Sequence, residues 1–178
     1  TALFENQKRE IGERQKQFDA SLLPQLKLVN NRQTNKPVVK FFEGKQGLGS
    51  CYNEFVERFR PAGGEDHAYI FYSKDMVDDL FTHAEREHYR KFRVGQHVPV
   101  KTLYTSDRLV MENSEDAIRI KVPSGEFPVS CDIGVHGDSM RIITLKKGKH
   151  TGILITDPDV CESMSSIFRL AWEAAEER

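Results

Sequence analysis

The sequence predicts an α/β domain built on a mixed sheet with flanking helices. Between residues 37 and 105, short apolar stretches of strand character alternate with stretches of helical periodicity. Between residues 129 and 155, three strands follow one another with only turns between them. Alternation with helices favours parallel strands and close succession favours antiparallel ones, so we expect the sheet to contain both.

A helix with a narrow apolar seam precedes this domain. Residues 2–22 are rich in Glu, Gln, Lys and Arg, which are good helix formers. The apolar residues of the seam follow heptad spacing: Phe4, Ile11, Phe18 and Leu22. Gln7 and Arg14 interrupt the seam, so a coiled coil here is short. Because so narrow a seam needs a partner, we expect residues 1–30 to form a dimerisation or linker helix of a homodimer.

The first half of the domain is expected to contain two strands that each lead into helical segments. Ser73 is a good N-cap for the helix after the second strand, and Gly95 follows the last residue of helical periodicity. The expected elements are a strand over 38–42, a helix from 44 to 59, a loop over 60–66, a strand over 68–72, a helix after 73 and a helix over 83–93.

The second half is expected to contain five strands and a final helix. Turn residues at 136–138 and 147–149 separate the last three strands. Asp157 and Pro158 are typical of an N-cap and a first helical position, and one apolar face then runs to Trp172. The expected elements are strands over 98–105, 118–122, 129–135, 140–146 and 152–155, and a helix that begins at 158.

The composition excludes several classes of protein. A length of 178 residues suits one domain with an appendage, and a formal net charge of −1 gives no electrostatic footprint for nucleic acid. No apolar run approaches the length of a membrane span, and no signal-peptide pattern is present. The three cysteines form no Cys-x-x-Cys pair, which argues against a disulfide framework or a thiolate zinc site. We expect a cytoplasmic protein that uses no cofactor or metal and binds no membrane.

No familiar catalytic set has the spacing that its chemistry requires. His83 and His88 stand five residues apart, about 140° around a helix, whereas zinc chelation from one helix needs a spacing of four. A phospholipase D-type set needs His-x-Lys followed by Asp, and its nearest approach has both gaps wrong: His97, Lys101 and Asp107. The sequence therefore predicts a protein that is not an enzyme.

Polar and aromatic residues gather where strands end, which is where open α/β sheets bind ligands. The candidates are Glu43, Gly44, Tyr72, Tyr104 and Ser106. Their rings, hydroxyls and carboxylate suit a sugar or another polar metabolite, although strand-end capping explains them equally well. Arg90 is a further candidate, from a helical stripe that also contains Arg86 and Arg93. The stripe suits an acidic ligand, but a solvated helix face is the favoured interpretation.

With these segments in place, the chain resembles the C-terminal part of TrmB-like transcriptional regulators. Three stretches carry the resemblance in the family's order. Residues 21–26 read Ser-Leu-Leu-Pro-Gln-Leu, and residues 36–47 are similar to the family pattern Lys-Pro-x-Val-x-Phe/Tyr-x-Glu-Gly. Residues 152–155 are followed by residues 167–175, which read Ile-Phe-Arg-Leu-Ala-Trp-Glu-Ala-Ala.

The resemblance implies a phospholipase D-like fold that senses an effector without catalysis, behind a dimerising helix. Residues 37–178 would be the effector-sensing domain of such a regulator. In the family a winged helix-turn-helix domain precedes the linker helix, and this sequence has no such domain, so DNA would be reached only through a part not present here. Two alternatives stay open: a phospholipase D-like phosphodiesterase with a divergent active site, and a dimeric scaffold that binds no ligand.

Overall fold

The computed structural model describes residues 36–60, 67–146, 148 and 150–178 of the chain. The seam residues Phe4, Ile11, Phe18 and Leu22 lie outside this part, so the dimerisation helix stays a prediction. The fold described below belongs to the unit Pro37–Arg178. Within it, no helix combines the length and the apolar character that a membrane span requires.

The elements follow the predicted order along the chain. They are β1 (Val38–Glu43), α3 (Gly44–Glu57), β2 (Ala68–Ser73), α4 (Lys74–Leu80), α5 (His83–Gly95), β3 (Val100–Thr105), β4 (Ala117–Lys121), β5 (Cys131–His136), β6 (Ser139–Thr144), β7 (Thr151–Thr156) and α6 (Pro158–Glu176). The ends of these elements differ from the predicted ones by about two residues at most, which is within the usual uncertainty of element boundaries.

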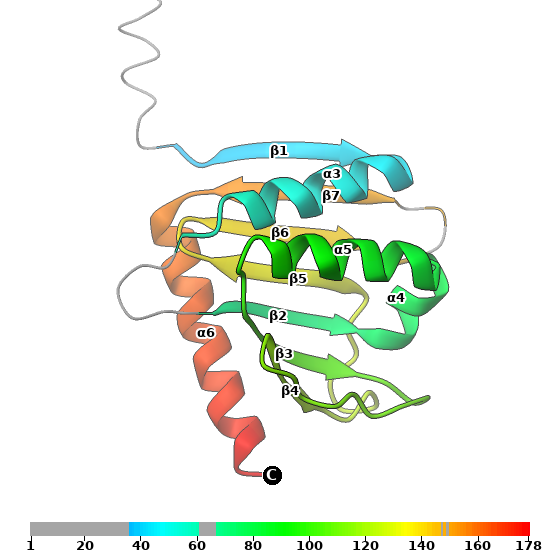
Figure 1. Ribbon diagram of the computed structural model, residues 1–178. Coiled ribbons are helices and arrows are strands. Elements are labelled where there is room, and N and C mark those ends of the chain that lie inside the picture. The colour runs from blue at the N-terminus through cyan, green and yellow to red at the C-terminus, as the bar shows by residue number, and fades with distance from the viewer. Residues whose placement is uncertain (1–35, 61–66, 147, 149) are drawn as a thin grey trace, which may run out of the picture. The chain divides into compact units, whose positions relative to one another are not determined.

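The strands form one seven-stranded sheet in the order β1-β7-β6-β5-β2-β3-β4. Strands β2, β3 and β4 are parallel to one another, and the remaining neighbours are antiparallel. The predicted mixed sheet is therefore confirmed. Strand β1 pairs with β7, so the first and last strands of the domain lie together at one edge of the sheet (Figure 1).

Helices cover both faces of the sheet and create two apolar cores. Figure 1 shows α3 and α5 on one face and α6 on the other. The core beneath α3, α4 and α5 contains Leu48 and Phe55, and the core beneath α6 contains Tyr69 and Trp172. Each of these large side chains contributes about 2 to 3 kcal/mol by leaving water.

Local sequence signals place the starts of two helices. The Asp157 side chain accepts a hydrogen bond from the Val160 N–H at 2.9 Å, and Pro158 takes the first helical position of α6. At the start of α5, Thr82 and Glu85 form a reciprocal capping box. Both helix starts were predicted to within a residue, because caps are local chemistry.

Candidate ligand-binding pocket

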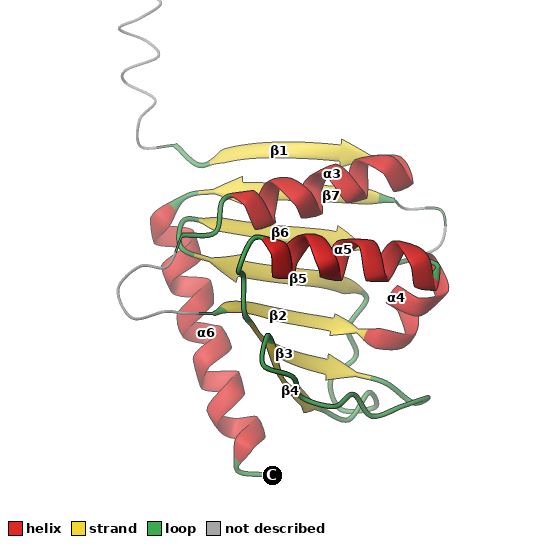
Figure 2. Ribbon diagram, viewed as in Figure 1, coloured by secondary structure: helices red, strands yellow, loops and turns green. Residues whose placement is uncertain are grey.

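A cavity of about 410 Å³ lies between the sheet and helices α3 and α5. Its floor comes from strands β2 to β6, and its walls come from the helices that Figure 2 shows across this face of the sheet. The lining combines aromatic rings with charged groups, including Tyr52, Tyr72, Arg90, Asp132 and Arg141. This mixture of apolar walls and a few convergent polar groups is typical of small-molecule sites.

Strand register explains why the floor is polar. The cross-strand pairs Arg141↔Gly134, Gly134↔Ile70, Ile70↔Thr102 and Thr102↔Arg119 place five residues in one row across five strands. All of them except Gly134 line the cavity. Two arginines therefore stand at opposite ends of the row, and the hydroxyl of Thr102 lies beside Arg119, with neighbouring strands about 4.8 Å apart.

Arg141 is the most buried charge of the floor, with 2% of the residue exposed. Its guanidinium carbon lies 4.8 Å from the ring centre of Tyr52 and 5.0 Å from that of Phe55. Its Nη1 donates to Oδ2 of Asp132 at 3.1 Å, and Nη2 lies 3.0 Å from Oδ1 without the alignment of a hydrogen bond. The cation is held by a carboxylate and two rings, as a buried charge requires.

Gly134 makes room for this guanidinium. A Cβ at position 134 would lie 2.8 Å from Nε of Arg141 and 3.0 Å from both Ile70 Cδ1 and Phe55 Cζ. Nε itself has no hydrogen-bond partner among the described residues. The glycine in β5 is therefore a packing requirement of the buried arginine.

Burial sets the protonation of the floor. It raises the pKa of the Asp132 carboxyl, and the charge of Arg141 opposes that rise. Burial likewise raises the pKa of the hydroxyls of Tyr52 and Tyr72. Both tyrosines consequently keep their protons at neutral pH, since an unperturbed tyrosine already titrates near pH 10. The Tyr52 hydroxyl donates to the Tyr89 carbonyl at 3.3 Å and the Tyr72 hydroxyl to Sδ of Met111 at 3.6 Å, so both oxygens remain as acceptors.

The arginines of α5 form the wall above this floor. Arg93 is 8% exposed and binds the Asp116 carboxylate and the Val98 carbonyl. Arg86 binds the Phe81 carbonyl, and its Nε lies 3.0 Å from Asp78. The interpretation of this stripe as a solvated helix face is wrong for Arg93, because its partner Asp116 arrives from a segment 23 residues away in sequence.

Helix α5 is fixed in place by contacts at its start. The Thr82 N–H donates to Oε2 of Glu85 at 2.8 Å, and Nζ of Lys45, in α3, donates to the same oxygen at 2.8 Å. Lys45 and the Thr82 groups lower the pKa of Glu85 to about 2. One carboxylate thus caps α5 and ties it to α3, and these two helices form the walls of the cavity.

Only some of the predicted ligand-binding residues lie at the cavity. Tyr72 and Arg90 line the cavity, whereas the other four do not. Glu43 is the last residue of β1 and Gly44 is the first residue of α3, and three strands separate β1 from β2. The Tyr104 hydroxyl accepts from the Met111 N–H at 2.7 Å, and the Ser106 hydroxyl donates to Asp75 at 2.6 Å. Both hydroxyls stabilise the segment after β3, in agreement with the capping alternative.

Sequence reasoning missed Asp132, Arg141, Thr102 and Arg119 in this cavity. One signal for two of them was present, because Asp132 and Arg141 are single charges within otherwise apolar strands. They stand nine residues apart across a tight turn, so a hairpin brings them onto one face. A buried ion pair explains such charges better than solvent exposure does.

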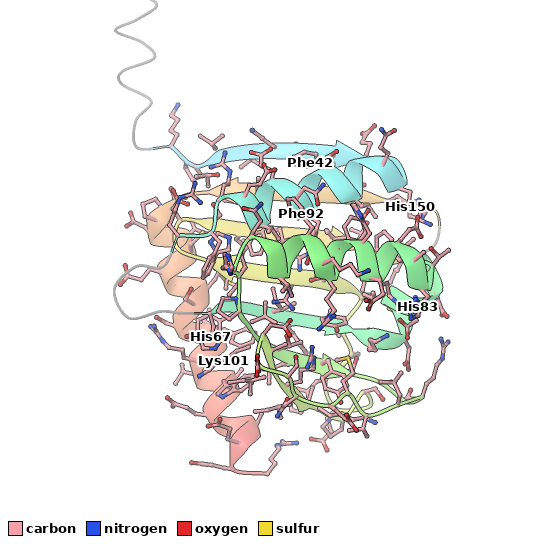
Figure 3. The ribbon with its side chains drawn as sticks, viewed as in Figure 1. Phe42, His67, His83, Phe92, Lys101 and His150 are labelled. Carbon is pink, nitrogen blue, oxygen red and sulfur yellow. The ribbon has the colours of Figure 1, made fainter. Side chains whose placement is uncertain are left out.

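The histidine and lysine candidates for catalysis do not converge. His97 precedes β3 and Asp107 follows it, so the length of a six-residue strand, roughly 20 Å, separates them. Lys101 points to the α6 face, where its Nζ lies 5.4 Å from the Trp172 ring centre (Figure 3). His83 and His88 are both exposed on α5.

Two other hollows lack the combination of apolar walls and buried polar groups that is typical of a ligand site. A hollow of about 840 Å³ beside α3 is lined mainly by polar groups at the surface, among them Ser50, Glu57 and Arg60. A groove of about 310 Å³ beside α6 is lined almost wholly by apolar side chains, such as Phe71 and Phe168. The cavity beneath α5 is the one of these three that has a buried ion pair in its lining.

Solved structures with the same fold include two that are informative. NucT from Helicobacter pylori matches with a TM-score of 0.53 and 9% identity, over 78% of this chain and 97% of NucT. TrmBL2, an archaeal chromatin protein whose structure shows a novel mode of DNA binding, matches with a TM-score of 0.51 and 14% identity. That match covers 97% of this chain and 66% of TrmBL2.

No protein-family model and no curated protein matches this sequence. At identities of 9% and 14% the structural matches show the fold alone. They agree with the mixed sheet and its flanking helices, so the predicted α/β fold is confirmed.

Proposed function

We propose that this chain is the effector-binding and dimerisation region of a TrmB-like transcriptional regulator and that it is not an enzyme. The observation that carries the proposal is the cavity with a buried ion pair in its floor between the sheet and α5. A site of this kind suits a small polar metabolite. The ordered sequence motifs and the fold that the chain shares with TrmBL2 support the choice of family.

DNA contact is proposed to come from a winged helix-turn-helix domain that is not part of this sequence. With a net charge of −1, the present chain carries no overall excess of positive charge to attract DNA. TrmBL2 is described as binding DNA, and 66% of its length is spanned by this chain. Part of TrmBL2 therefore has no counterpart here.

Effector binding is testable by thermal unfolding of the chain with a panel of neutral sugars, sugar phosphates and carboxylic acids. A ligand at a hundred times its dissociation constant stabilises the folded state by about 2.7 kcal/mol. Met111→Trp places an indole in the cavity lining and should abolish the shift. Val110→Trp is the matched control, because Val110 is its neighbour, is 74% exposed and does not line the cavity.

Two results would contradict effector binding. No stabilisation by any compound of the panel would favour the dimeric scaffold that binds no ligand. A shift that persists in Met111→Trp would place the ligand elsewhere. Far-UV circular dichroism of both tryptophan variants establishes that they fold.

The homodimer is testable by light scattering after size exclusion. Ile11→Glu with Phe18→Glu places two charges on the seam and should yield a monomer at micromolar concentration. Asn6→Glu with Ala20→Glu adds the same charge about 200° around the helix from the seam and should leave the dimer intact. A seam variant that stays dimeric would contradict a dimer held by this helix.

The phosphodiesterase alternative makes a different prediction. Turnover of bis(p-nitrophenyl) phosphate that disappears in His97→Ala would favour the enzyme. We expect no turnover above the buffer rate, because His97 and Asp107 lie beyond opposite ends of β3 and the Lys101 side chain points to the α6 face.

A further inference from the structure

We propose that the effector carries a phosphomonoester group and that Arg119 and Arg90 bind it. This inference rests on the proposed function, because it specifies the chemistry of a ligand in the same cavity. It replaces the neutral sugar of the sequence-based expectation with a phosphorylated compound of similar size.

The first observation is the number of cations around the cavity. Six basic side chains line it: Lys74, Arg86, Arg90, Arg93, Arg119 and Arg141. The acidic side chains of the lining are Glu87 and Asp132. Low-dielectric walls strengthen the field of charges that face a cavity, so an imbalance here acts on a ligand more than it would at an open surface.

The second observation is that carboxylates are shared between cations. Asp78 contacts both Lys74 and Arg86. Asp116 contacts both Arg93 and Arg90, the latter at 3.5 Å. Because each of these carboxylates serves two cations, neither pair of cations is neutralised.

The remaining carboxylates do not restore neutrality. Asp132 is used by Arg141, and Glu87 lies 4.0 Å from Arg90. Within the described residues, six cations of the lining therefore face four carboxylates, counting Asp78 and Asp116, and two positive charges remain in excess.

Arg119 shows where part of this excess lies. Its Nη1 binds the Glu112 and Ala117 carbonyls, the latter at 3.2 Å, and the Ser114 hydroxyl at 3.4 Å. None of these partners is charged, and across the described residues no carboxylate oxygen forms an ion pair with this guanidinium. The three bonds all use Nη1, so the opposite edge of the guanidinium remains for a planar or tetrahedral anion.

Arg90 provides a second cation at the mouth of the cavity. Its side chain is 48% exposed and its contacts with Asp116 and Glu87 are loose, at 3.5 and 4.0 Å. Asp116 is shared with Arg93, so Arg90 can turn to an incoming anion at little cost. A guanidinium from β4 and one from α5 thus lie on the same cavity.

The charge and size of a phosphomonoester match this site. Such a group carries between −1.5 and −2 charges near pH 7, roughly equal to the excess of positive charge. A volume of about 410 Å³ corresponds to about 14 water-sized groups at about 30 Å³ each, which is the scale of a monosaccharide phosphate. The hydroxyls of Tyr72 and Thr102 on the floor are suited to the hydroxyls of such a compound.

The test compares matched compounds by isothermal titration of the whole chain. The pairs are ribose with ribose 5-phosphate, glucose with glucose 6-phosphate, and glycerol with glycerol 3-phosphate. We expect the phosphorylated member of at least one pair to bind, its neutral partner to bind at least tenfold more weakly, and inorganic phosphate to compete with it. Added NaCl should weaken the binding, because the contact is between charges.

Variants connect the binding to the proposed residues. Arg119→Gln and Arg90→Gln should each lower the affinity for the phosphorylated compound by about tenfold to a hundredfold, which is the usual effect of removing a hydrogen bond to a charged group. Arg119→Lys should restore part of the affinity. Arg169→Gln makes the same chemical change on an exposed position of α6 and should have no effect. Because Arg90 is on the surface, its variant remains informative if Arg119→Gln fails to fold.

The outcomes separate the two proposals. A neutral member that binds as tightly as its phosphorylated partner overturns the phosphate inference and leaves effector binding intact. Phosphate binding that survives both Arg119→Gln and Arg90→Gln overturns the assigned site. Absence of binding by every compound of the pairs, together with no thermal shift across the wider panel, contradicts both the phosphate inference and the proposed function.

Discussion

Arg141 and Asp132 form a buried ion pair diagonally across the β5–β6 hairpin. Arg141 faces Gly134 in the register and Asp132 faces Ile143, so the two charges are two pairs apart and lie on the same face of the sheet. The distance from Nη2 to Oδ1 is 3.0 Å, and 3% and 16% of the two side chains are exposed. Neither charge has another ion-pair partner among the described residues, so each depends on the other.

Asp132→Asn should lower the free energy of unfolding by about 3 kcal/mol, because it leaves the Arg141 cation buried without a counter-ion. Urea unfolding at neutral pH measures the loss. The double change Asp132→Leu with Arg141→Met removes both charges and should recover most of the stability, since a packed apolar pair often replaces a buried ion pair at no cost. A loss below about 1 kcal/mol in Asp132→Asn would mean that water in the cavity already solvates Arg141.

Gly134→Ala should also destabilise the domain, by about 1 to 3 kcal/mol. The new methyl group would lie 2.8 Å from Arg141 Nε, and Phe55 and Ile70 close the other sides, so no neighbour can move freely. Gly125→Ala is the matched control, since nothing lies within 4 Å of a Cβ at that exposed turn. Urea midpoints of the two variants give the comparison, and equal midpoints would show that the arginine moves aside.

The sequence was sufficient to predict the helices and strands, but not which strands are neighbours in the sheet. Alternation of period two and local caps located β1 and α6, because these signals depend on residues close in sequence. Strand order depends on long-range pairing, so Glu43 at the end of β1 was grouped with Tyr72 although three strands separate β1 from β2.

The cavity was harder to predict for the same reason. A stripe of arginines on one helix has the same pattern whether it faces water or a buried carboxylate. Arg93 is buried because Asp116 reaches it from the segment before β4. Arg119 lines the cavity because β4 pairs in parallel with β3 and this register places Arg119 opposite Thr102. Both placements depend on tertiary contacts, which the local sequence pattern does not reveal.

His136 should make the stability of the domain depend on pH. The ring is 3% exposed, its Nε2–H donates to the Phe55 carbonyl at 2.8 Å, and the Phe55 ring centre lies 4.3 Å away. Burial lowers the pKa of His136 to about 4. Since the unfolded chain titrates near pH 6.5, it binds more protons than the folded state between the two values, and stability is lost as the pH falls.

Unfolding in urea at pH 7.5 and pH 5.0 measures this loss. His136 should account for about 2 kcal/mol of this loss, because pH 5.0 lies about 1.5 units below the pKa of the unfolded chain and each unit corresponds to about 1.4 kcal/mol. His136→Gln keeps a donor for the Phe55 carbonyl and should show a smaller pH dependence, whereas His83→Gln, at an exposed position, should behave as the parent. The same slope in all three proteins would show that His136 is protonated in the folded state.

The three cysteines should differ in their reactivity, and one of them reports on the docking of α6. Cys51 and Cys161 are fully buried, whereas Cys131 in β5 is half-buried. Burial raises the pKa of Cys51 and of Cys161 to about 11. A thiol with that pKa has roughly a hundredfold less thiolate at pH 8 than one with a pKa near 9, before any barrier to access is counted.

Iodoacetamide at pH 8 should therefore alkylate Cys131 in the folded protein and leave the other two, as peptide mass spectrometry would show. In urea all three should react at similar rates, which serves as the control for intrinsic reactivity. Cys161 lies in α6 beneath its contact with the sheet, in the core that contains Trp172. Trp172→Ala should weaken that contact and expose Cys161 while Cys51, on the opposite face, stays protected. Rapid alkylation of Cys161 in the parent protein would instead mean that α6 leaves the sheet without global unfolding.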